Sequence, residues 1–207
     1  SSLMPLSYDE NKWKKAADAA LEAINLAESN GYSLYEMREG DLSGYPEPQD
    51  LTQRTLRFTF MDKDNSKEVL FAETRKAGAY GLQPKSLPYL SDGSWNGVAP
   101  TLTMVERFYT KNGLPIDEDP KYYTPGDYFK IGQYEGRTTC NLNLKREPRF
   151  YSWVSFHNGY FEMQREGYNE GRIVTMFRKS DNHGKQNRST DFSLSGYLVK
   201  KLSLIHI

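Results

Sequence analysis

The sequence holds one cysteine, Cys140, and three histidines among its 207 residues. A lone cysteine cannot form an internal disulfide, and no Cys-x-x-Cys spacing is present to hold zinc. A Gly-x-Ser-x-Gly nucleophile elbow is absent as well. These absences argue against a disulfide-stapled scaffold, a zinc module and a serine hydrolase. We therefore expect Cys140 to be a half-buried structural residue, and we predict no metal and no cofactor.

The sequence also lacks an excess of either charge, because 27 Lys and Arg residues balance 27 Asp and Glu residues. Nucleic-acid-binding domains usually carry a basic stripe, which is missing here. The mean hydropathy is −0.76, and no apolar run is long enough to predict a spanning helix. The opening residues SSLMPLSYDE have neither the charged nor the apolar region of a signal peptide. We expect the chain to be an internal fragment of a longer protein.

Aromatic residues are abundant, with 15 Tyr, 10 Phe and 3 Trp. Tyrosine combines a flat apolar face with a polar tip, which suits interfaces and the recognition of amphipathic ligands such as sugars. The alternative is a tyrosine-rich rim around the core, which would account for most of the fifteen.

The first 35 residues predict one long helix. Ser7 lies three residues before Glu10, the spacing of a capping box. Asn30-Gly31 supplies a left-handed stop, so the helix would be about 20 residues and roughly 30 Å long. One face would carry the residues that recur at three- and four-residue steps, namely Trp13, Ala17, Ala20, Ile24 and Ala27. Small residues beside a tryptophan are typical of one helix of a tetratricopeptide-like pair.

The next segments predict loops. Residues 40–53 are rich in Gly, Pro, Asp and Ser, and beyond them Leu56, Phe58 and Phe60 alternate with polar residues. The sequence from Asp62 to Glu73 imitates a calcium loop, but Lys67 stands where that loop needs glycine. A solvated turn is the favoured interpretation.

Residues 76–100 form an irregular stretch that carries large aromatic side chains. Loops of this length in a compact domain are usually functional, although the rings could instead fold back on the core. Tyr80, Tyr89 and Trp95 are spaced through the stretch.

The last hundred residues predict two helices and two short strands. Thr101 is placed to cap a helix that Asn112-Gly113 ends, and Pro148 is placed to begin another. The buried side of the first would comprise Met104, Val105, Phe108 and Tyr109, and that of the second Phe150, Trp153 and Val154. Residues 115–137 are interpreted as mostly loop, and residues 171–179 and 195–202 as strands. The fold class is mainly α with minor β, irregular and loop-rich.

Five motifs occur in order at sensible spacing: W…AADAALEAI…GYSLY, KEVLFA, APTLTMVERFYTKNGLPID, REPRFYSWVSF and SGYLVKK. Together they resemble the SusD/RagB family, the surface-exposed glycan-binding lipoproteins of the outer membrane in Bacteroidota. The resemblance implies that residues 1–45 end a tetratricopeptide-like half and that residues 46–201 are part of the C-terminal region. The fragment would be incomplete at both ends. The closing LSLIHI, residues 202–207, departs from the family and is expected to be a non-native tail.

The resemblance implies a non-catalytic protein that binds oligo- or polysaccharide at the cell surface and delivers it to a SusC-type TonB-dependent transporter. It also implies a lipid anchor in the outer membrane, although the lipid-attachment cysteine is absent from this sequence. A pyranose packs its C–H face on an aromatic ring, while its hydroxyls need polar partners. The candidate contacts are the rings of Trp95, Tyr80 and Tyr89 and the polar groups of Asn96, Asp92 and Arg75.

Three other interpretations are open. A glycoside hydrolase needs two suitably spaced carboxylates, for which Asp117, Glu118 and Asp119 are candidates by clustering alone, although the cluster is more typical of a solvated loop. A protein-interaction scaffold could be built on the helix at 9–30. Arg146 and Arg149 around Glu147 could grip an acidic sugar, although a local ion pair is favoured.

Overall fold

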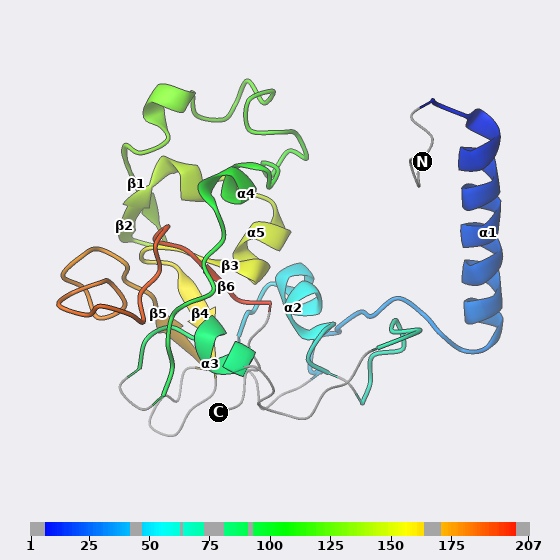
Figure 1. Ribbon diagram of the computed structural model, residues 1–207, viewed down its shortest axis with the longest axis horizontal. Helices are drawn as coiled ribbons and strands as arrows, with labels where there is room; N and C mark the ends of the chain where they lie inside the picture. Colours follow the sequence, from blue (N-terminus) through cyan, green and yellow to red (C-terminus); the bar gives the residue numbers. More distant parts are fainter. Residues whose placement is uncertain are drawn as a thin grey trace. The chain divides into compact units, whose positions relative to one another are not determined.

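The computed structural model describes residues 7–41, 47–62, 64–72, 81–90, 93–163 and 171–201 (Figure 1). The chain divides into two compact units, Ser1–Tyr35 with Asp64–Thr74, and Glu36–Lys63 with Arg75–Ile207. The proposed domain boundary at residues 45 and 46 stays a prediction. Residues 202–207, the expected non-native tail, lie outside the described residues.

Five short or medium helices, two 3₁₀ turns and six short strands occur in the described residues. In chain order they are α1 (Glu10–Ser29), α2 (Leu51–Phe58), α3 (Leu82–Ser86), α4 (Leu102–Glu106), η2 (Pro125–Asp127), β1 (Ile131–Tyr134), β2 (Arg137–Cys140), η3 (Asn141–Asn143), α5 (Pro148–Trp153), β3 (Val154–Ser155), β4 (Tyr160–Glu162), β5 (Arg172–Val174) and β6 (Leu198–Val199).

Helix α1 dominates the first unit and has the predicted length of 20 residues. It ends as predicted, with Asn30 as the C-cap and Gly31 in the left-handed region at φ 84°. The start differs from the prediction, because the side chain of Asp9 accepts from Asn11 N at 3.0 Å and takes the capping role expected of Ser7. A carboxylate at this position also interacts favourably with the helix dipole.

None of the residues of α1 is buried, so the predicted apolar face lies open within the described structure. Trp13 is 66% exposed and Ile24 is 53% exposed. The tetratricopeptide-like pairing of this helix stays a prediction. No helix in the described ranges is both long and apolar enough to cross a membrane.

Helix α2 is the first helix described in the second unit, and it corrects the part of the expected loop at 40–53 that it covers, residues 51–53. The carboxylate of Asp50 accepts from Gln53 N at 2.8 Å, and this cap starts the helix at Leu51. Two side chains of α5 anchor it: Ser152 Oγ donates to Gln53 O at 3.1 Å, and Trp153 Nε1 donates to Leu56 O at 3.0 Å.

The strands form three separate antiparallel pairs, β1–β2, β3–β6 and β4–β5. The strands expected within 171–179 and 195–202 are confirmed as β5 and β6. The β1–β2 hairpin lies where the sequence was interpreted as mostly loop. Glu135 and Gly136 both have positive φ, 46° and 77°, which is the backbone of a tight two-residue hairpin turn.

Two hydrophobic clusters form the core of this unit. The larger comprises Val105, Ile116, Tyr122, Tyr128, Leu142, Phe150, Val154, Phe156 and Tyr197. The smaller comprises Leu87, Phe161, Met163, Ile173 and Leu198, and so joins the β4–β5 pair to β6.

Helix α4 confirms its predicted cap but not its predicted length. Thr101 Oγ1 accepts from Met104 N at 3.2 Å, and the helix ends after five residues. Val105 is fully buried as expected, whereas Met104 is 50% exposed and Tyr109 is 42% exposed. A helix of little more than one turn can present only one residue squarely to the core. Pro148 begins α5, as predicted.

Candidate functional site

Of the six predicted contact residues, three are described in the structure and three are not. Arg75, Tyr80 and Asp92 lie outside the described residues, so their role stays a prediction. Tyr89, Trp95 and Asn96 are described, and they occupy three distinct environments.

Trp95 is 40% exposed, so part of its ring is open to solvent. Its backbone is held by Trp95 N donating to Pro84 O at 2.7 Å. The ring lies against Gly81, where an added Cβ would come within 3.1 Å of Trp95 Cζ3 and φ is +58°. The ring of Trp95 is therefore partly exposed at the surface, and its contacts with neighbouring residues hold it in place.

Asn96 is fully buried, which removes its side chain from direct contact with a ligand. Its Nδ2 donates to His183 O at 2.8 Å, and its backbone N donates to Leu87 O at 3.0 Å. The predicted rim contact at Asn96 is therefore replaced by a structural role: the side chain ties the loop after α3 to the loop that carries His183.

Tyr89 is half-buried and forms one wall of a pocket of about 530 Å³. Strand β5 and the loop that follows it supply most of the remaining walls. The other lining residues are Leu90, Arg172, Ile173, Val174, Met176, Asn182, His183 and Gln186. The volume falls in the range of small-molecule sites. Of the predicted residues that are described, Tyr89 alone lines this pocket.

Arg188 organises the rim of the pocket. Its guanidinium carbon lies 3.8 Å from the centre of the Tyr89 ring, a cation–π contact. Its Nη1 donates to Gln186 Oε1 at 2.9 Å, and its Nη2 donates to Asn182 O at 3.3 Å and to Gly184 O. One side chain thus fixes both the aromatic wall and the polar loop opposite it.

His183 is 6% exposed and stands at the edge of the pocket as a neutral acceptor. Its Nδ1 accepts from Met176 N at 3.0 Å. Burial, helped by the charge of Arg188, lowers the pKa of His183 to about 4. Protonation would therefore remove an acceptor from the Met176 amide and place a charge in a dry site.

We expect the protein to lose stability on acidification through the titration of His183. The unfolded chain binds this proton near pH 6.5 and the fold resists it until about pH 4, so stability rises with pH across that window. The full shift corresponds to roughly 3 kcal/mol. Chemical denaturation at pH 7 and pH 4 measures the free energy of unfolding. Its decrease between the two pH values should be smaller in His183→Gln than in the parent protein, by about this amount. An equal loss in both proteins would contradict the assignment.

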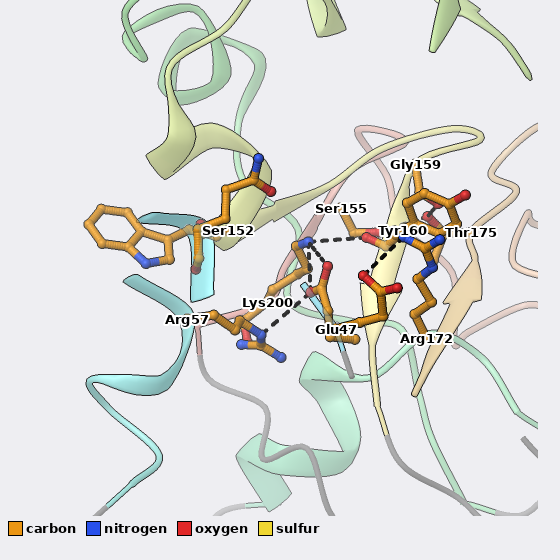
Figure 2. A network of polar contacts seen from close by, with 12 residues as sticks. Glu47, Arg57, Ser152, Ser155, Gly159, Tyr160, Arg172, Thr175 and Lys200 are labelled. Carbon is orange, nitrogen blue, oxygen red and sulfur yellow. Dashed lines mark hydrogen bonds and ion pairs between the residues drawn. The ribbon is translucent and has the colours of Figure 1, made fainter. Parts of the chain in front are cut away.

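A buried polar network lies beside the pocket (Figure 2). Lys200 Nζ contacts both carboxylate oxygens of Glu162, at 3.2 and 3.0 Å, and Arg57 Nε lies 3.6 Å from the same carboxylate. Arg57 also donates to Lys200 O. Burial lowers the pKa of Arg57 to about 10, against the raising effect of Glu162, and burial likewise lowers the pKa of Lys200.

Arg172 extends this network to the pocket. Its Nη1 donates to Glu47 Oε2 at 3.2 Å, and its guanidinium carbon lies 3.7 Å from the centre of the Tyr160 ring (Figure 2). Glu47 is 7% exposed, and burial raises its pKa while the charge of Arg172 lowers it. Sequence reasoning named none of these residues as functional.

The acidic cluster at 117–119 does not resemble a hydrolytic pair. Asp119 is buried and accepts from Thr110 Oγ1 at 2.6 Å, from Asn112 Nδ2 at 2.9 Å and from Lys121 N at 2.9 Å. The hydrogen bond from Thr110, with those from Lys121 and Asn112, lowers the pKa of Asp119. A carboxylate held ionised by three donors braces a turn and is a poor general acid. Asp117 and Glu118 are exposed.

Arg146 and Arg149 play opposite roles. Arg149 forms the expected local ion pair, with Nη2 2.6 Å from Glu147 Oε2 at the surface. Arg146 is 2% exposed and turns inward, where it donates to four backbone carbonyls: Val105 O at 2.6 Å, Phe108 O at 2.7 Å, Leu142 O at 2.8 Å and Tyr109 O at 3.4 Å. Arg146 therefore belongs to the core and cannot reach a ligand.

Metal-binding geometry is absent from the described residues, since no three His, Cys, Asp or Glu side chains gather there as ligands. Glu73, the twelfth position of the calcium-like segment, lies outside the described residues, so the interpretation of this segment as a solvated turn stays a prediction.

Comparison with known proteins identifies the fold. Two solved structures of BT4246, one of them the selenomethionine form, match with TM-scores of 0.75 and 0.74 at 24% identity. They cover 97% and 98% of this chain and 37% and 38% of the BT4246 chain. A SusD-like protein, BF3747, from Bacteroides fragilis NCTC 9343 matches with a TM-score of 0.51 at 19% identity, over 83% of this chain and 30% of its own.

No curated protein matches the chain. The chain spans less than two fifths of the length of these solved structures, and at such identities the likeness shows the fold. The model of the SusD family matches residues 63–204, which is more than half of the sequence and includes the pocket at Tyr89. The chain belongs to the SusD family.

Proposed function

We propose that this protein binds oligo- or polysaccharide at the bacterial cell surface and breaks no bond in it. Membership of the SusD family supports this proposal. The observation that carries it is the pocket at Tyr89, where an aromatic wall faces the exposed residues Asn182 and Gln186. Delivery to a SusC-type TonB-dependent transporter, a lipid anchor in the outer membrane and a tetratricopeptide-like role for α1 belong to the same proposal.

The chemistry of the pocket suits a sugar ring. A pyranose offers an apolar C–H face to an aromatic ring and a rim of hydroxyls to polar groups. Arg188 already covers Tyr89 at 3.8 Å, so the ring is held rigid before a ligand arrives and loses little entropy on binding. The side chains of Asn182 and Gln186 lie at the rim, within reach of hydroxyls.

Trp95 provides a second exposed ring outside this pocket. An extended polysaccharide could use it as a further platform, as the sequence predicts. Catalysis is not part of the proposal, since Asp119, the buried acid of the candidate cluster, is fully engaged in structural hydrogen bonds.

We expect Tyr89→Ala to weaken glycan binding roughly tenfold, because ring stacking contributes on the order of 1 kcal/mol beyond the buried area. Affinity gels and calorimetry with a panel of polysaccharides measure the loss. Release of reducing sugar from the same panel should stay at background, and its appearance would favour a hydrolase.

Tyr109→Ala is the matched control, because Tyr109 is a 42% exposed tyrosine that does not line the pocket. It should bind glycans as the parent protein does. An equal loss in both variants, or unchanged binding in Tyr89→Ala, would remove the pocket from the proposal.

A further inference from the structure

Arg172 is the one charged side chain among the described residues that line the pocket at Tyr89, although the whole chain is neutral. Its nine described lining residues include Arg172 and no aspartate or glutamate. Arg188, in the loop that follows β5, lies over the Tyr89 ring at 3.8 Å and brings a second positive charge close to the pocket. Charges around a cleft raise the local concentration of the opposite charge. This surface therefore favours an anionic ligand.

Arg172 lines this pocket, and two contacts hold its planar guanidinium group in place. The guanidinium stacks on Tyr160 at 3.7 Å, and Nη1 is engaged with Glu47 at 3.2 Å. The side chain is 27% exposed, and among the described residues Nε and Nη2 of Arg172 make no hydrogen bond to protein. A guanidinium so held keeps donors in a rigid fork that matches carboxylate and sulfate oxygens.

Glu47, the ion-pair partner of Arg172, does not line the pocket at Tyr89. It lines a separate cavity of about 190 Å³ that also includes Glu162 and Lys200. Arg172 lines both cavities, whereas Glu47 lines only the smaller one. An anion in the larger pocket would therefore meet Arg172 from the face that Glu47 leaves open, with Arg188 close by on Tyr89.

We propose that the pocket at Tyr89 recognises an anionic sugar unit, one that carries a carboxylate or a sulfate ester. Arg172 grips the acidic group, the ring of Tyr89 packs on the sugar face, and Asn182 and Gln186 bind hydroxyls. This inference rests on the proposed function and narrows it to a substrate class.

Two pairs of polymers, each an anionic polymer and its neutral counterpart, test the inference on the unaltered 207-residue protein. Polygalacturonate is compared with its methyl ester, and dextran sulfate with dextran, by calorimetry at low and moderate salt. We expect at least tenfold tighter binding to one anionic polymer than to its neutral partner, because charge-assisted hydrogen bonds are about twice as strong as neutral ones. The first pair reports a carboxylate ligand, and the second reports a sulfate ester.

Arg172→Gln should abolish this preference, measured as the ratio of the affinities for the anionic and the neutral polymer within each pair. Arg137→Gln is the matched control, since Arg137 also stacks on Tyr160, at 4.2 Å, but does not line the pocket. Circular dichroism checks that both variants fold. A preference lost equally in both variants would mean that the stack on Tyr160, and not the pocket, sets it, and would overturn the inference.

The experiment distinguishes a failure of the anionic-ligand inference from a failure of the proposed glycan-binding function. Equal or tighter binding of the neutral partners in both pairs by the parent protein overturns the anionic inference and leaves the proposed function standing. This comparison needs no variant, so it holds even if Arg172→Gln does not fold. Absence of binding to these four polymers and to the wider neutral panel would overturn the proposed function as well.

Discussion

Arg146→Met is expected to lower the free energy of unfolding by roughly 3–5 kcal/mol, because it orphans buried carbonyls that each cost about 1–3 kcal/mol when unsatisfied. In the structure Arg146 donates to Val105 O, Phe108 O and Leu142 O, all within 2.8 Å. Two of these carbonyls, those of Val105 and Phe108, lie at the C-terminal end of α4. A positive charge there also interacts favourably with the negative end of the helix dipole. Methionine fills much of the volume but donates nothing.

Arg149→Met is the control, because this neighbouring arginine is 47% exposed and pairs with Glu147 at the surface. Exposed ion pairs contribute at most about 1 kcal/mol. Urea denaturation of the two variants should therefore separate them by several kcal/mol. A similar small loss in both would show that Arg146 is replaceable and that the carbonyls find water instead.

Local signals explain what the sequence predicted well. Asn30-Gly31 ends α1, Thr101 caps α4 and Pro148 begins α5, and each depends only on residues within one helical turn. The same reasoning placed the cap of α1 at Ser7 when Asp9 holds it. Both residues suit that position, so sequence alone does not choose between them.

Contacts between distant segments explain what the sequence could not predict. Arg146 and Arg149 flank Glu147 and look equivalent, yet one is buried and the other exposed. Their difference depends on α4, which brings the carbonyls of Val105 and Phe108, about 40 positions earlier in the chain, to Arg146 alone. No periodicity within residues 146–149 carries that information.

The sequence analysis named one of the described residues that line the candidate pocket. Tyr89 was predicted because a large ring in an irregular loop needs a purpose, whereas Arg172, Asn182 and Gln186 were missed. A signal for them exists in the polar, basic stretch RKSDNHGKQNR, residues 178–188. What it could not show is that this stretch folds back over Tyr89 through Arg188.

Glu162→Gln is expected to destabilise the protein by roughly 3–5 kcal/mol, since it removes a negative charge that pairs with the buried cations Arg57 and Lys200. Lys200 is 2% exposed, and its Nζ contacts both oxygens of the Glu162 carboxylate, at 3.2 and 3.0 Å. Arg57 is also 2% exposed and lies 3.6 Å from it. Glutamine keeps the shape and one acceptor oxygen, so the loss reports charge and not volume.

The variant should also acquire a characteristic pH dependence. Burial already lowers the pKa of Lys200, and Glu162 opposes that shift, so removing the carboxylate lowers the folded pKa further. The unfolded chain then binds a proton that the fold rejects, and stability rises with pH up to the unfolded value of 10.5. Urea denaturation from pH 7 to pH 9 should show the deficit of Glu162→Gln shrinking.

Adding Lys200→Met to Glu162→Gln separates charge from packing. The double variant removes one of the two buried cations, so it should be more stable than Glu162→Gln alone and should lose the pH dependence. Paired with Lys200→Met, it completes a double-mutant cycle that isolates the coupling between the two side chains. Simple additivity in that cycle would mean that Glu162 and Lys200 do not depend on each other, and that solvent reaches a network the structure places in the interior.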